Sequence, residues 1–285
     1  TGVYKGVAPD ADLIIVKGGD RYFYTDKIID GLTYIFEQAE GFSQPCALNL
    51  SVGTTHYGPH DASSEFESAL DGLTGQGRVV VVPAGNDGSR NIHFSAHQLP
   101  AEITITVGQN NQSIEDYLRI NIWSNDNSEY DNLENISLKI IPPSGHAFGP
   151  VAPNSLESRQ DEEGYVYVDN FNGGPAGNGD NETLIRLGDY YTGGELQNRL
   201  AEGEWTLRIS GDGGDVQGWL YEASVQAEIS SGADASLLLP EPANARTVIT
   251  VGAYVSRTSW PALSSFQPEA DTVGDISDFS SPGPT

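Results

Sequence analysis

Four consecutive valines, Val79–Val82, restrict the fold of this 285-residue chain more than any other feature. A strand that is apolar at every position needs cover on both faces, which is typical of parallel sheets packed between helices. Such sheets are built from strands that alternate with helices through right-handed crossovers. The valines therefore predict a parallel α/β sheet.

The segments on either side of the valines alternate between strand-like and helix-like patterns. Leu13–Val16 and Ala47–Leu50 are short apolar runs, and we expect both to be strands. Apolar residues recur at helical spacing in Thr25–Phe36 and again in Ser63–Leu73. A further strand pattern covers Thr247–Ala253, close to the end of the chain. This alternation supports the α/β prediction.

Between about residues 98 and 240 the pattern changes. Gly, Asn, Asp and Ser dominate the connections, and long helical patterns are missing. Strand-like segments joined by such turns predict an antiparallel β-sandwich or jelly roll. The expected strands are Glu102–Val107, Tyr117–Trp123, Ile136–Ile141, Tyr165–Asp169, Thr183–Leu187, Glu204–Ile209 and Gln217–Tyr221.

The two patterns together predict an α/β domain that is interrupted by an inserted antiparallel domain. The expected division is 1–97 for the first part of the α/β core, 98–240 for the insert and 241–285 for the continuation of the core. Insertions are tolerated where the ends of the inserted segment lie close together on a surface. Unpaired sheet edges could also drive dimerisation, so the oligomeric state stays open.

Forty acidic residues against 14 basic ones give a net charge of −26. The electrostatic field of this negative charge repels nucleic acid and anionic membranes, so we expect neither as a partner. No apolar run approaches the roughly 20 residues that span a bilayer. The sequence has neither a methionine nor a signal pattern, and we expect a processed product or a piece of a longer protein. Adaptation to high salt and an ordinary acidic secreted enzyme both explain the charge.

No metal or cofactor is expected. The pairs His56/His60 and His93/His97 have the spacing of zinc ligands on a helix, but the glutamate of the zinc-protease motif is missing from both. The acidic turns Asn178–Asn181 and Asp212–Asp215 lack the ligand spacing of a dedicated calcium loop, so structural Ca²⁺ has no supporting motif. The single cysteine, Cys46, excludes an internal disulfide and is interpreted as a buried filler.

Two motifs stand at strand ends, where open α/β sheets place their ligands. Asn86 follows the valine strand in Pro83–Gly88 and could donate its amide N–H to a substrate oxygen, or it could belong to a plain turn. Ser51–Gly53 ends the strand at Ala47–Leu50. An extended peptide could pair with this segment by strand addition, or the strand could simply turn there. Each motif alone leaves both alternatives open.

Taken in order, five segments resemble the core blocks of the subtilase family of serine proteases. They are Gly6–Leu13, Ala47–Gly53, Gly77–Gly88, Val248–Ala253 and Phe279–Pro284. The resemblance covers roughly residues 1–97 and 241–285. A looser likeness, carried by Ile141–Gly145 and Glu241–Tyr254, connects the insert with the jelly roll of clostridial spore-germination proteases.

The resemblance implies an extracellular serine endopeptidase that cleaves polypeptides through an acyl-enzyme. Asn86 falls on the family's oxyanion-hole asparagine, which stabilises the negative oxygen of the tetrahedral intermediate. The implied substrate-binding positions are Ser51, Val52 and Gly53, which pair with the substrate backbone and form one wall of the primary specificity pocket, and Ala84 and Gly85 on the opposite wall.

The catalytic triad is the main departure from the family pattern. Subtilases carry it in the order Asp, His, Ser, and neither His-Gly-Thr-His nor Gly-Thr-Ser-Met occurs in this sequence. An oxyanion donor without nucleophile and base cannot run acyl transfer, so we expect residues 1–285 to be inactive alone. One alternative is a pseudoprotease or binding protein on a subtilase scaffold. The other is a sandwich that binds carbohydrate or protein. In that sandwich Trp123, Trp205 and Trp219 could form a platform for a sugar, or they could pack in the core between strands.

Overall fold

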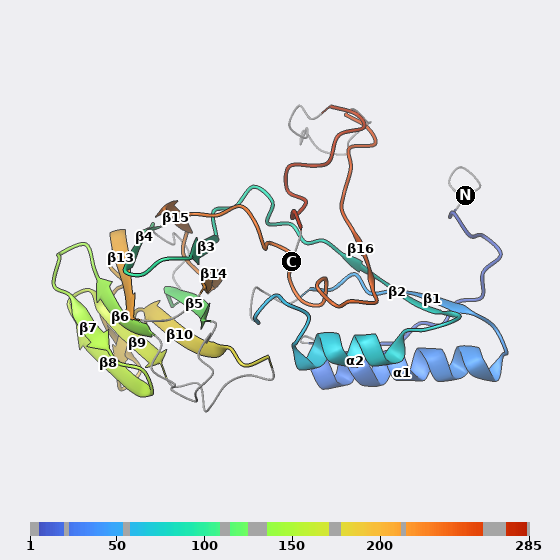
Figure 1. Ribbon diagram of the computed structural model, residues 1–285, viewed down its shortest axis with the longest axis horizontal. Coiled ribbons are helices and arrows are strands. Elements are labelled where there is room, and N and C mark those ends of the chain that lie inside the picture. The colour runs from blue at the N-terminus through green and yellow to red at the C-terminus, as the bar shows by residue number, and fades with distance from the viewer. Residues whose placement is uncertain are drawn as a thin grey trace.

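The computed structural model describes residues 6–19, 23–53, 58–108, 115–124, 136–170, 178–211, 215–258 and 272–283. These residues form two parts that lie side by side (Figure 1). One part is a small parallel sheet with two helices, and the other consists of antiparallel sheets. Most strands belong to the second part. The fold is therefore mainly β, and the predicted α/β class describes it only in part.

The parallel sheet has the order β1 (Cys46–Asn49), β2 (Arg78–Pro83), β16 (Ile249–Val251). The valine strand β2 is central, and it pairs in parallel with both neighbours. The consecutive strands β1 and β2 are joined by a crossover that contains helix α2, which is the usual connection between parallel strands. β16 arrives from the far end of the chain, after the antiparallel strands.

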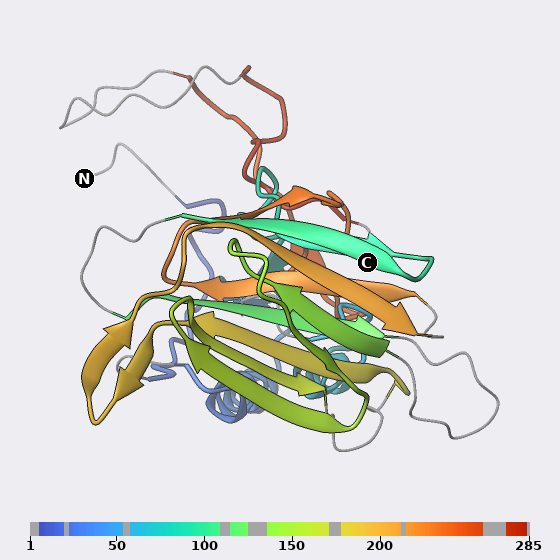
Figure 2. The same cartoon turned by 90° about the vertical axis from the view of Figure 1, so that its left-hand side faces the viewer.

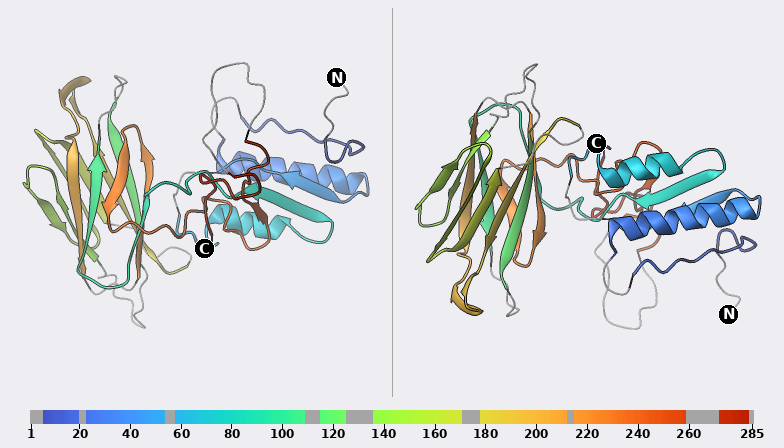
Figure 3. Two further views of the ribbon diagram at one scale, coloured as in Figure 1. Left: turned by 90° about the horizontal axis from the view of Figure 1, so that it is seen from above. Right: turned by 90° about the horizontal axis from the view of Figure 1, so that it is seen from below.

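Helices α1 (Thr25–Gly41) and α2 (Glu65–Leu73) lie on the same face of the parallel sheet (Figures 1 and 3). Both helices contribute apolar side chains to a core that they share with β1 and β2. α2 begins at the N-cap Ser64, whose Oγ accepts a hydrogen bond from the Glu67 amide at 3.2 Å. The core consists of Leu32, Phe36, Leu48, Phe66, Leu70, Val80, Val82, Ala243 and Ala245.

Two predictions about this part are wrong. The valine strand is not covered on both faces by the described residues: Val80 and Val82 are buried, whereas Val79 is 37% exposed. Ile249 of β16, the register partner of Val81, is 51% exposed. Leu13–Val16 is not a strand, and Leu13 and Ile15 are 81% and 87% exposed. A strand needs a neighbour for its backbone N–H and C=O groups, and no described strand pairs with these residues.

The antiparallel strands form two larger sheets and a two-stranded one (Figure 2). The six-stranded sheet has the order β3 (His93–Ala96), β14 (Val216–Ala223), β5 (Tyr117–Ser124), β10 (Asn181–Gly188), β9 (Gly164–Asn170), β8 (Ser155–Asp161). The five-stranded sheet has the order β15 (Ala227–Ser231), β4 (Ala101–Val107), β13 (Gly203–Gly211), β6 (Ile136–Ile141), β7 (Phe148–Val151). β11 (Tyr190–Thr192) pairs with β12 (Glu195–Asn198).

One apolar core lies between the two larger sheets. β13 shows why, because it buries Trp205, Leu207 and Ile209 at alternate positions. All seven strands expected between 98 and 240 are observed, as β4, β5, β6, β9, β10, β13 and β14. Trp123, Trp205 and Trp219 are only 8%, 1% and 0% exposed, so none of them is an open platform for a sugar. Strand-core packing is confirmed for Trp205, which belongs to the core between the two sheets.

Trp219 of β14 joins the two parts. The His60 ring, from the segment just before α2, stacks on it with ring centroids 4.1 Å apart, and His93 of β3 stacks on it at 4.7 Å. His60 Nδ1 also lies 2.8 Å from the carbonyl oxygen of Leu239. All three rings are buried, so the joint is a packed contact. Neither helix of the described residues is long and apolar enough to cross a membrane.

Candidate functional site

The carboxyl edge of the parallel sheet brings the two predicted motifs together. The Ala84 amide donates to the Val251 carbonyl at 2.9 Å, so the pairing of β2 with β16 continues one residue past the valine strand. On the other side, the Leu50 amide donates to the Val81 carbonyl at 2.9 Å. Ser51 and Ala84 therefore begin two segments that leave the same edge of the sheet.

Asn86 lies on the surface, in a loop whose neighbouring backbone is held firmly. Its side chain is exposed, whereas Ala84 is buried and Gly85 is half-buried. Ser281 contacts the backbone on both sides of Asn86: its amide donates to the Gly85 carbonyl at 3.2 Å, and its Oγ accepts from the Asp87 amide at 3.0 Å. One residue further on, the Gly88 amide donates to the Phe279 carbonyl at 3.0 Å. The side chain at the tip of the loop is thus free to face a ligand.

Gly85 and Gly88 are glycines because the loop has no room for a side chain. Gly85 has φ = +94°, a region that favours glycine, and a Cβ there would lie 2.7 Å from Pro240 Cδ and 2.9 Å from Ser281 Oγ. A Cβ on Gly88 would lie 2.7 Å from the Asp278 carbonyl oxygen and would also collide with that of Ser280. The two glycines let residues 278–281 approach the loop closely.

The predicted substrate-binding residues Ser51, Val52 and Gly53 are accessible. Ser51 and Gly53 are exposed and Val52 is half-buried, and the Asn49 side-chain amide donates to Ser51 Oγ at 2.9 Å. They follow β1, which lies at the edge of the parallel sheet and pairs only with β2 among the described strands. The geometry therefore suits strand addition by an extended peptide.

Pro240 lies between the two predicted walls of the pocket. A Cβ on Gly53 would be 3.4 Å from Pro240 Cγ, and the same ring meets Gly85 from the other side. Pro240 belongs to the segment that returns to the parallel sheet after β15. The space between Gly53 and Gly85 is consequently narrow.

Two buried carboxyl groups lie beside this segment. Glu241 is 8% exposed and Glu67 of α2 is fully buried. Burial raises the pKa of Glu241 to about 7. A hydrogen bond from Ser64 lowers this pKa, whereas the negative charge of Glu67 raises it further. Burial also raises the pKa of Glu67, against hydrogen bonds from Ser64 and Asn244. Burial and the charge of a neighbouring carboxylate both favour the protonated form of a carboxyl group.

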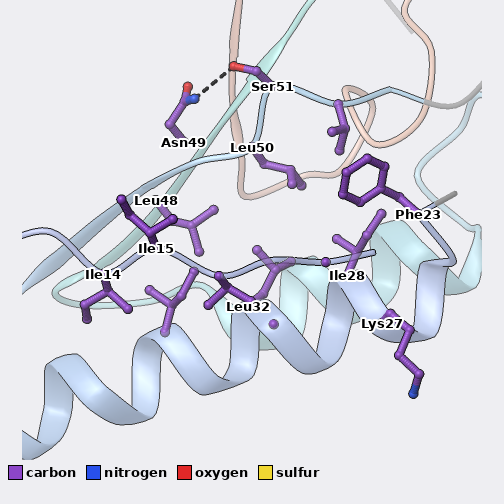
Figure 4. A pocket seen from close by; sticks show the side chains of 15 residues that line it. Ile14, Ile15, Phe23, Lys27, Ile28, Leu32, Leu48, Asn49, Leu50 and Ser51 are labelled. Carbon is purple, nitrogen blue, oxygen red and sulfur yellow. Dashed lines mark hydrogen bonds between the residues drawn. The ribbon is translucent and has the colours of Figure 1, made fainter. Parts of the chain in front are cut away.

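A separate hollow of about 360 Å³ lies between α1, β1 and residues 14–18 (Figure 4). Its walls are mainly apolar, with Ile14, Ile28 and Leu32 on one side and Leu48 on the other. Ser51 and Val52 line this hollow as well, and the next residue, Gly53, is the one that approaches Pro240.

The remaining sequence candidates are explained by structural roles. His93 lies on β3, not on a helix, and its Nε2 is 2.9 Å from Gln217 Oε1, while His97 pairs with Asp215. The Asn178 amide donates to Asp61 and to Asp180. No cluster of three metal-ligating side chains occurs in the described part of the chain. His56 and Asp212–Gly214 lie outside the described residues.

Cys46 is the first residue of β1 and is half-buried. Burial raises the pKa of its thiol, so the group stays protonated and unreactive near neutral pH.

Pro240, Glu241 and Ser281 were not identified as site residues from the sequence. Their importance depends on where the chain returns after the antiparallel strands, and no periodicity marks that. Two of the three had a signal: Ser281 stands in the block Phe279–Pro284, and Glu241 begins the stretch Glu241–Tyr254.

Comparison with known proteins identifies relatives of this arrangement. The model of the subtilase family matches residues 1–186. Among solved structures, the CspB protease of Clostridium perfringens is similar with a TM-score of 0.66 and 21% sequence identity, over 82% of this chain and 47% of that protein. The present chain thus spans about half the length of that relative, and the likeness shows a shared fold. No curated protein matches significantly.

Proposed function

Since the chain belongs to the subtilase family, we propose that it is part of a serine endopeptidase to which it contributes the oxyanion donor and the substrate-binding strand. The observation that carries this proposal is the loop after β2. It exposes the Asn86 amide at the carboxyl edge of the sheet and fixes the backbone on both sides of it.

The proposed reaction is the hydrolysis of a peptide bond through an acyl-enzyme. A serine Oγ attacks the substrate carbonyl, and the carbonyl oxygen becomes negatively charged in the tetrahedral intermediate. The side-chain N–H of Asn86 would donate a hydrogen bond to this oxygen, and the bond would be stronger in the transition state than in the ground state.

The substrate is proposed to be an extended polypeptide that lies along Ser51–Gly53. Its backbone would pair with the open edge of this segment, and the side chain before the scissile bond would enter the space between Gly53 and Gly85. Because Pro240 narrows that space, a small side chain fits better than a bulky one.

The motifs of the triad are absent from residues 1–285, and we propose that another part of the protein supplies it. We propose the same organisation as inferred above: a subtilase core in 1–97 and 241–285, with an inserted jelly-roll-like domain in 98–240. An extracellular location completes the proposal, and the acidic surface is compatible with it.

Labelling with a fluorophosphonate probe, which reacts with activated serines, tests the proposal. The full-length protein should be labelled, and the chain of residues 1–285 should stay unlabelled as a matched control. A full-length protein that remains unlabelled after any propeptide is removed would overturn the proposal and favour a pseudoprotease whose cleft binds peptides without cleaving them.

A further inference from the structure

Ser281 bonds to the backbone on both sides of Asn86. Its amide donates to the carbonyl of Gly85, and its Oγ accepts from the amide of Asp87. The only residue between these two anchors is Asn86 itself. Ser281 is 5% exposed, so its hydroxyl does not exchange readily between the loop and solvent.

The loop needs such an anchor because the backbone of a glycine is conformationally permissive and does not fix itself. Gly85 is in the left-handed region at φ = +94°, and Asn86 after it is exposed. The ion pair of Asp87 with Arg90, at 2.6 Å, involves an arginine whose side chain is 55% exposed. Exposed ion pairs order a chain weakly, so the buried Ser281 contacts are the firmer restraint.

A donor stabilises an oxyanion effectively only if it is held in place before the charge appears. A displacement of about 1 Å at a catalytic group can cost on the order of 100-fold in rate. We infer that Ser281 is a positioning residue: it holds the loop so that the Asn86 amide points at the oxyanion. This inference rests on the proposed function and adds to it a second residue, which acts through Asn86.

The neighbouring Ser280 provides a matched control. It is 7% exposed, and its Oγ accepts a hydrogen bond from the Ala253 amide at 3.1 Å. Ser280→Ala and Ser281→Ala therefore each remove one hydroxyl and one buried hydrogen bond. Only the Ser281 hydroxyl contacts the loop of Asn86.

The test is a double-mutant cycle in the full-length protein, with kcat and KM measured on a peptide substrate. We expect Ser281→Ala to lower kcat about 10- to 100-fold with KM changed less than about twofold, and Ser280→Ala to leave kcat close to that of the wild type. In the Asn86→Ala background, Ser281→Ala should cause no further loss, because the residue it positions is gone.

Equal losses with and without Asn86 would overturn the inference, as would a Ser281→Ala protein with wild-type kcat. Amide hydrogen exchange on the 1–285 chain separates this result from a failure of the proposed function. Exchange at Asp87 and Gly88 should become faster in Ser281→Ala, and unchanged exchange would show that Ser281 does not hold the loop. If the loop loosens while the wild-type protein neither hydrolyses peptides nor labels, the proposed function is at fault.

Discussion

The ring of Pro240 packs directly against Gly85, so closely that a Cβ on Gly85 would lie 2.7 Å from Pro240 Cδ. Gly85 follows the central strand of the parallel sheet, and Pro240 lies 155 positions later, after the last antiparallel strand. Strands β3 to β15 thus all lie in the sequence between two residues that contact each other at the candidate site. The returning segment completes this site.

Gly85→Ala should destabilise the protein by at least about 2 kcal/mol. The new methyl group would meet Pro240 and Ser281, and alanine disfavours φ = +94°. Urea unfolding of the 1–285 chain, followed by circular dichroism, measures the change in the free energy of unfolding.

Gly72→Ala is the matched control for this substitution. Gly72 lies in helix α2, and a Cβ there would meet no atom within 4 Å. The change should be neutral or stabilising by up to about 1 kcal/mol, as expected for an open helical position. Equal free energies of unfolding for the two variants would show that Gly85 is not sterically confined.

Pro240→Gly in the full-length protein should broaden substrate preference toward larger side chains before the scissile bond. The ring contacts the positions of both Gly53 and Gly85, so its removal widens the space between them. Cleavage of a peptide library by both proteins measures the preference. A wild-type protein that already favours aromatic residues at this position would contradict the assignment of Pro240.

The free energy of unfolding of the wild type should decrease as the pH rises, and Glu241→Gln should abolish this decrease. The pKa of Glu241 is raised from 4.5 to about 7 in the folded protein, so the folded state binds this proton more tightly than the unfolded state. The contribution of this proton to stability is complete below about pH 4.5, decreases as the pH rises toward 7 and is lost above it. The loss is on the order of 3 kcal/mol.

The measurement is the free energy of unfolding of the 1–285 chain at pH 5 and pH 8. At pH 8 the free energy of unfolding of the Glu241→Gln protein should be larger than that of the wild type. At pH 5 the two free energies should be similar. Glu228→Gln, at an exposed position of β15, removes the same formal charge and controls for the net charge. If both glutamine variants respond alike, the burial of Glu241 is not the cause.

The melting temperature of the 1–285 chain should rise with KCl concentration. The 40 acidic residues greatly outnumber the 14 basic ones, so the excess carboxylates repel one another in the folded state. Salt screens this repulsion. A titration from low to molar KCl by differential scanning fluorimetry follows the effect. A melting temperature that stays flat over this range would mean that self-repulsion does not limit stability.

The sequence predicted the elements whose patterns are local. Alternation along Glu204–Ile209 and helical spacing in Ser63–Leu73 depend only on near neighbours, and both became elements of the expected type, β13 and α2. Strands β3, β7, β8, β11, β12 and β15 were missed, since they are short or largely polar and gain their identity from pairing.

Predictions that depended on distant partners were less successful. Leu13–Val16 has the composition of a buried strand, but composition cannot reveal whether a partner strand is available. The same limit applies to the candidate site. Asn86 was predicted because it follows a strand in a familiar motif, whereas Pro240 and Ser281 reach its loop from far along the chain.

The turnover of the full-length Asn86→Ala protein on a peptide substrate tests the central claim most directly. We predict that kcat falls about 10²–10³-fold while KM changes little, a magnitude established for removal of this donor in subtilisin itself, a protein of the same family. An Asn86→Ala protein that retains the wild-type kcat would contradict the assignment of Asn86 as the oxyanion donor.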